Sequence, residues 1–162
     1  MTGFGISSSY KNFDLSFFFQ GSLNSSFFID AYNTSPFIDT SGGAIGNNAL
    51  LSAWANDHWS ENDRNLYAAW PRLSDQLIDN NNRNSTWWLR DGSFLRLKSI
   101  EFGYSVPDRL ASRVNLSSAR IYITGSNLFT FSKFKLWDVE MGGNGLGYPI
   151  QQGANVGVNL NF

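Results

Sequence analysis

The chain has 162 residues, a formal net charge of −1 and a pI of about 5.7, so it is long enough for one domain but lacks the basic stripe of a nucleic-acid-binding protein. A mean hydropathy of −0.25 with 15% charged residues argues against a helical membrane protein and against a highly charged soluble one. The sequence contains no cysteine, which excludes disulfides and thiolate metal sites. Aromatic residues make up 16% of the chain and suit strands with one apolar face.

The first predicted element is a hairpin over residues 2–21. Apart from Ser8, apolar or aromatic residues recur at every second position from Phe4 to Phe19, on both sides of a tight turn at Lys11 and Asn12. Small and polar residues such as Asp14 occupy the opposite parity. Phe18 interrupts the alternation, and we expect its ring to pack against a neighbouring element.

A very long loop is predicted over residues 22–92, where alternation is lost and Asn, Ser, Asp and Gly predominate. It contains a short predicted helix over residues 47–55, capped by Asn47 or Asn48. Five of its residues are candidate ligand or partner contacts: Trp54, Trp59, Trp70, Trp87 and Trp88. These rings could stack on sugars, or they could fold the loop onto itself and contact a partner protein. We favour the second interpretation.

Alternation returns over residues 94–106, where apolar side chains occupy every second position from Ile100 onward. Leu95 and Leu97 fall on the wrong parity for this face. Their positions predict either a β-bulge near Lys98 or a strand end that stands clear of the buried surface.

The last two strands are predicted over residues 118–129 and 153–162. Pro107 ends the preceding strand, and residues 108–114 are expected to form one or two helical turns. A second loop is expected over residues 130–150. The final strand alternates without a fault between apolar residues and Gly or Asn.

Five strands joined alternately by short and long connections are typical of an antiparallel up-and-down transmembrane β-barrel. A tilted strand of about 9–11 residues crosses the hydrocarbon layer, which fits the final strand. We therefore predict an all-β fold in which about five strands form a segment of a larger barrel with long extracellular loops. The predicted lipid-facing residues are Ile100, Phe102, Tyr104, Ile121, Ile123, Val156, Val158, Leu160 and Phe162.

Two further groups follow from the same parity. Tyr10, Phe13 and Tyr104 fall at one end of the strands on the apolar parity, as expected of an aromatic girdle at a membrane boundary. Glu101 and Arg120 share the opposite, lumen-facing parity on adjacent strands. We expect these two charged residues to form a structural pair.

No residue is assigned a catalytic, cofactor-binding or metal-binding role. Asp57, Glu61 and Asp63 lie near the single histidine, His58, but their spacing matches no metal-ligand template. The glycine-rich run at residues 142–147 is not followed by a helix that could hold a phosphate. The sequence therefore predicts a protein that is not an enzyme.

Several short motifs occur in a distinctive order along the chain. They are YKNFDL at residues 10–15, PRL at 71–73, RDGSFLRLKSI at 90–100 with FGYSVP at 102–107, IYITGSNLFT at 121–130, and the ending on Phe162. In this order they strongly resemble the C-terminal region of SusC/RagA-type TonB-linked outer-membrane transporters. The resemblance covers most of the chain outside residues 23–53.

This resemblance implies a barrel of roughly 22 strands with a plugged lumen, located in the cell outer membrane and importing oligosaccharides or peptides. The implied partners are outer-membrane lipid, the remaining barrel and plug, a SusD-like surface lipoprotein, and the TonB energising complex acting through an N-terminal part. Five strands cannot close a barrel, because the smallest natural barrels use about 8. Met1 leads directly into a strand pattern without an export signal, so we expect the chain to be part of a longer protein.

Two alternatives compete with the importer. A soluble β-sandwich could bind carbohydrate through its tryptophan-rich loop, which would require the apolar faces of its sheets to pack on each other. A hydrolase using loop carboxylates is the weaker alternative, because one histidine and no cysteine leave few catalytic groups.

Overall fold

A computed structural model describes residues 1–37, 49–75 and 77–162. The chain divides into two compact units, each described here by itself. The sheet unit comprises Met1–Ser25, Gly92–Lys133 and Ile150–Phe162, and the loop unit comprises the described parts of Ser26–Asp91 and Phe134–Pro149. Among the described residues, no helix has the length and apolar character needed to cross a membrane.

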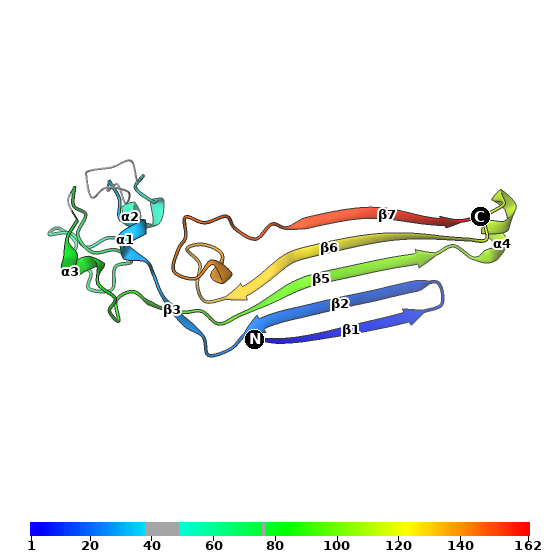
Figure 1. The fold of residues 1–162 in the computed structure, drawn as a ribbon, viewed down its shortest axis with the longest axis horizontal. Helices are drawn as coiled ribbons and strands as arrows, with labels where there is room; N and C mark the ends of the chain where they lie inside the picture. The colour runs from blue at the N-terminus through cyan, green and yellow to red at the C-terminus, as the bar shows by residue number, and fades with distance from the viewer. Residues whose placement is uncertain (38–48, 76) are drawn as a thin grey trace. The chain divides into compact units, whose positions relative to one another are not determined.

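The sheet unit is one open antiparallel sheet of five strands (Figure 1). Its strands are β1 (Thr2–Tyr10), β2 (Phe13–Ser22), β5 (Phe94–Ser105), β6 (Ser118–Ser132) and β7 (Gly153–Asn161). Each strand pairs with the next in the order β1-β2-β5-β6-β7, which confirms the predicted antiparallel all-β class. Within this sheet, β1 and β7 each have one paired edge.

Short connections join the strands at one end of the sheet, where Figure 1 also places the C-terminus. The β1–β2 turn has Lys11 in the left-handed region, with φ of 55°. Between β5 and β6 lie α4 (Asp108–Ala111) and the 3₁₀ helix η1 (Ser112–Val114). Asn115 ends this helical segment with φ of 58°, a conformation that asparagine tolerates better than most residues. The predicted tight turn and helical turns are therefore confirmed.

A β-bulge at Lys98 resolves the parity conflict in β5. Ser99 pairs with Phe18 of β2, but Leu97 pairs with Phe19, so Lys98 is skipped in the register. The pairing of β5 with β6 also shifts between Leu97 and Ser99. Apolar residues on both sides of the bulge therefore lie on one face of the sheet. Of the two predicted alternatives, the β-bulge near Lys98 is the one that the structure contains.

The second loop is shorter at its start than the predicted 130–150, because β6 continues to Ser132. Phe129 and Phe131 continue the alternation and pair with Leu97 and Leu95 of β5. Because the part of β5 that precedes the bulge pairs with the end of β6, β6 continues three residues past its predicted end at residue 129.

Among its described residues, the loop unit contains six short elements, of which the sequence analysis predicted only the helix that corresponds to α2. They are β3 (Ser26–Phe28), α1 (Ala31–Thr34), α2 (Ser52–Asn56), α3 (Asp79–Asn82), β4 (Leu89–Asp91) and η2 (Val139–Met141). β3 and β4 pair with each other. Three-residue strands are too short to show a period-2 pattern, which is why the sequence did not reveal them.

The predicted helix over residues 47–55 corresponds to α2, which begins later, at Ser52. Leu51 occupies the position before its first turn and makes no side-chain capping bond. The proposed caps Asn47 and Asn48 lie outside the described residues.

Candidate functional site: a two-faced sheet and a tryptophan-rich loop unit

Strand register brings the predicted lipid-facing residues onto one face of the sheet. One cross-strand row runs from Phe13 through Tyr104 and Ile121 to Val158. The other members of the set in β5, β6 and β7 occupy the same face in neighbouring rows: Ile100, Phe102, Ile123, Val156 and Leu160. Phe162 follows β7 with the same parity. Whether these side chains contact lipid stays a prediction.

This apolar face is exposed rather than packed. Val156 is 73% exposed, Val158 56% and Ile123 53%. An extended exposed apolar surface marks a contact with a membrane or another protein, because leaving it in water is unfavourable. The face therefore requires an apolar environment.

Aromatic rings cluster at the short-connection end of the apolar face. Tyr10 pairs with Phe13, which in turn pairs with Tyr104. The ring centroids of Phe13 and Tyr104 lie 4.8 Å apart. The geometry thus assembles the three residues of the predicted girdle in one row.

The opposite face carries a charged cluster centred on Arg120. Arg120 Nη2 lies 2.6 Å from Glu101 Oε1 and 2.5 Å from Asp14 Oδ2, and Arg120 Nε donates to Asp14 Oδ1 at 3.1 Å. The expected Glu101–Arg120 pair is present, but the sequence analysis missed Asp14 as its third member. The signal available was the polar parity of Asp14 in β2.

Gly103 makes room for this cluster. It is the register partner of Asp14 in β2, and a Cβ atom built on Gly103 would meet both Arg120 Nη2 and the Asp14 carboxylate. The guanidinium also lies over the Tyr122 ring, 5.1 Å from its centroid. β2, β5 and β6 are therefore tied together by polar contacts on this face.

Three of the five candidate tryptophans form the core of the loop unit. Trp54 is fully buried, and Trp88 and Trp70 are 2% and 5% exposed. The Trp70 ring lies 4.7 Å from Trp54 and 4.9 Å from Trp88, measured between centroids. Trp137, which the sequence analysis did not single out, contacts Trp54 at 6.4 Å. In this arrangement these rings stabilise the loop unit, and whether any of them also contacts a ligand or partner stays a prediction.

The remaining two candidates, Trp59 and Trp87, are half-buried and retain accessible surface. The indole Nε1 of Trp87 is buried and has no hydrogen-bond partner in the part of the chain that the structure describes. A buried donor without an acceptor costs about 1–3 kcal/mol. Within the described residues, the loop unit therefore supplies no hydrogen-bond acceptor for the Trp87 indole.

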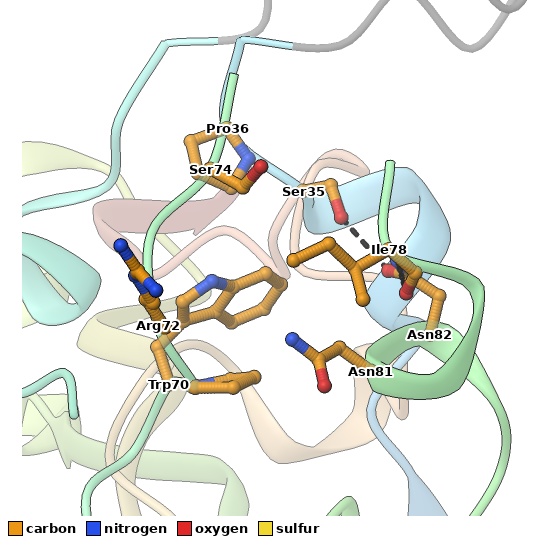
Figure 2. Close-up of a pocket in the computed structure, with 9 residues that line it drawn as sticks. Ser35, Pro36, Trp70, Arg72, Ser74, Ile78, Asn81 and Asn82 are labelled. Carbon is orange, nitrogen blue, oxygen red and sulfur yellow. Dashed lines mark hydrogen bonds between the residues drawn. The ribbon is translucent and has the colours of Figure 1, made fainter. Parts of the chain in front are cut away.

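The loop unit contains a small cavity beside α3 (Figure 2). Trp70, Arg72 and Ile78 line it, and the Ser35 hydroxyl bonds to Asn82 Oδ1 at 2.8 Å. Its volume of about 20 Å³ matches roughly one water molecule. This cavity is too small to hold a nutrient.

A second cavity, of about 630 Å³, is large enough for a ligand. Its lining includes Asp57, Tyr67, Trp87 and Arg90. Arg90 Nη1 donates to the carbonyl oxygens of Trp87, at 2.5 Å, and Leu89, at 3.0 Å. Partial burial lowers the pKa of Arg90 from its usual value, but a guanidinium remains charged throughout the physiological range.

The carboxylates near His58 are not arranged as a metal site. His58 Nδ1 lies 3.0 Å from the carbonyl oxygens of Trp54 and Ala55. Glu61 forms an exposed ion pair with Arg72 at 3.5 Å. Within the described ranges, no group of three or more His, Asp or Glu side chains is placed to hold a metal ion.

The chain is similar to curated receptors along most of its length. It is 30% identical over 138 residues to TonB-dependent receptor P3 of Formosa agariphila, covering 85% of this chain and 12% of the relative. The receptor P26 of the same organism is 29% identical over 175 residues, with 99% and 16% coverage. No protein-family model matches the sequence. These relatives identify the sheet and its loops as part of a TonB-dependent receptor.

Further matches narrow the class. TonB-dependent receptor SusC of Bacteroides thetaiotaomicron is 28% identical over 156 residues, covering 94% of this chain and 14% of the relative. The RagAB peptide transporter has a TM-score of 0.69 at 25% identity, covering 99% of this chain and 17% of that one. Its 'closed-closed' state has a TM-score of 0.66 at 24% identity. The chain belongs to the SusC/RagA family and spans less than a fifth of the length of these relatives.

Proposed function

We propose that this chain forms five consecutive strands, near the C-terminus, of the barrel wall of an outer-membrane nutrient importer. The observation that carries the proposal is the exposed apolar face, continuous across all five strands and opposite a polar face with the Arg120 cluster. The apolar face contacts lipid and the polar face lines the plugged lumen. Kinship with TonB-dependent receptors supports import of an oligosaccharide or a peptide as the activity of the whole protein.

The proposal also includes the partners of this chain. The second edges of β1 and β7 pair with strands of the remaining barrel, because an open edge in lipid leaves backbone groups unsatisfied. The ends joined by the tight turn and α4 face the periplasm, and the long connections are extracellular. The extracellular loops contact a SusD-like surface lipoprotein, and the TonB complex acts through the plug. A soluble β-sandwich is disfavoured because the apolar face has no covering sheet in the described residues.

The test compares arginine on the two faces of β7. Val158→Arg should impair outer-membrane assembly of the full-length receptor, because an arginine facing lipid near the midplane costs about 2–4 kcal/mol. Asn159→Arg, one residue further and on the other face, is the matched control and should assemble normally. Assembly is measured by the amount of folded, heat-modifiable receptor in outer-membrane fractions. Equal assembly of both variants would refute the assigned orientation.

A further inference from the structure

The cavity of about 630 Å³ in the loop unit has Arg90 in its wall, and within the described residues this arginine forms no ion pair. Arg90 donates from Nη1 to two backbone carbonyls, and within the described residues its Nη2 and Nε make no hydrogen bond or ion pair. The two carbonyl bonds fix the guanidinium at the cavity wall. Its remaining donors have the planar geometry that binds a carboxylate through two parallel bonds.

The rest of the wall suits a ligand with a flat or ring-shaped body. Tyr67 is 95% exposed, and Trp87 is half-buried. Aromatic rings supply contact area at low entropic cost. The hydroxyls of Ser85 and Thr86 add neutral hydrogen-bonding groups.

We propose that this cavity recognises a carboxylate-bearing ligand, with Arg90 as the residue that binds the carboxylate. The inference rests on the proposed importer function and narrows its cargo to an acidic one. The carboxylate belongs either to a uronic acid in an oligosaccharide or to the C-terminus of a peptide. Asp57, in the same wall and not ion-paired with Arg90, would accept from a sugar hydroxyl in the first case and from an ammonium group in the second.

The experiment measures binding calorimetrically with the purified full-length receptor. The probes are trigalacturonate with its neutral methyl ester, and a free-acid tripeptide, Phe-Gly-Phe, with its C-terminal amide. One acid should bind at least about tenfold more tightly than its neutral counterpart, because hydrogen bonds between charged groups are stronger than those between neutral groups. Binding of neither acid, or equal binding of acid and neutral form, overturns the proposal.

Variants test the role of Arg90 itself. Arg90→Gln should weaken binding of the preferred acid by about tenfold or more, and Arg90→Lys should recover part of the loss because it restores the charge. Arg64→Gln removes an exposed arginine that does not line this cavity and should leave binding unchanged. If Arg90→Gln binds the preferred acid as tightly as the unchanged receptor, Arg90 does not bind the carboxylate and the proposal fails.

Asp57→Asn separates the two sources of carboxylate. Weaker binding of the tripeptide identifies an ammonium partner and a peptide ligand, whereas unchanged or tighter binding of trigalacturonate identifies a uronide. All variants lie in the loop unit, outside the five-stranded sheet, so we measure their assembly in the outer membrane separately from ligand binding. Normal assembly with no preference for acids would overturn this inference and leave the proposed barrel function standing.

Discussion

Single residues tie the strands together on the polar face of the sheet. Arg120 contacts Asp14, which is 106 residues away in sequence, and Glu101 on the adjacent strand. Gly103 lies between them and leaves the space that the guanidinium and the Asp14 carboxylate occupy. Glycine is required here for room rather than for an unusual backbone conformation.

This arrangement predicts non-additive stability effects. Gly103→Val should displace the guanidinium and lower the thermal midpoint of the full-length receptor by several degrees, as should Arg120→Met, which leaves two carboxylates facing each other. The double variant should unfold close to the less stable single variant, because both changes remove the same contacts. Ser7→Val, on the same face of β1 and exposed, is the control. Fully additive shifts would show that Gly103 acts independently of the cluster.

At the scale of the element, the bulge in β5 and the backbone of β6 set which residues share a face. Asn127 in β6 has φ of 54°, and its Nδ2 donates to the Gln151 carbonyl at 2.9 Å. Gln152 Nε2 donates in turn to the Leu128 carbonyl at 3.1 Å. The irregular part of β6 is thereby held to the segment that precedes β7.

Two variants separate the two contributions of Asn127 to stability, its left-handed backbone conformation and its side-chain hydrogen bond. Asn127→Val should destabilise the receptor by about 1–2 kcal/mol, because a left-handed conformation is costly for residues with a Cβ atom and worse for branched ones. Asn127→Gly loses the side-chain bond but accepts the positive φ, so its loss should be smaller. Denaturant unfolding of the full-length receptor gives both values. An equal loss in both variants would assign the effect to the Gln151 bond.

At the scale of the whole molecule, the sheet unit exposes two kinds of surface that promote association between chains. Its apolar face carries exposed Val, Ile and Phe side chains, and β1 and β7 each have an edge with no partner in the described chain. Unpaired edges and apolar patches both promote association between chains. The environment of a complete barrel in a membrane would remove both.

We therefore predict that the isolated chain is soluble only in detergent. In buffer alone the 162-residue chain should sediment as aggregate, and in detergent micelles it should remain in solution. Analytical ultracentrifugation in both conditions distinguishes these states. A monodisperse monomer without detergent would contradict the membrane assignment and favour the soluble binding module.

The elements that the sequence revealed are those with strong local patterns. Alternation located all five strands of the sheet, and the misplaced Leu95 and Leu97 indicated the bulge at Lys98. The short strands β3 and β4 stayed hidden, because three residues carry too little periodicity and their pairing joins segments about sixty residues apart. The end of β6 was also missed, since its last residues are fixed by their partners in β5.

By itself, the sequence determined the two faces of the sheet and the family. Period-2 alternation and the order of motifs can both be recognised along the chain without knowledge of tertiary contacts. Tertiary structure alone decided which distant residues meet. It placed Asp14 beside Arg120, packed Trp54 against Trp70, and brought Asp57 and Arg90 into one cavity wall. These contacts depend on register and loop packing, which bring together side chains whose spacing in sequence carries no period.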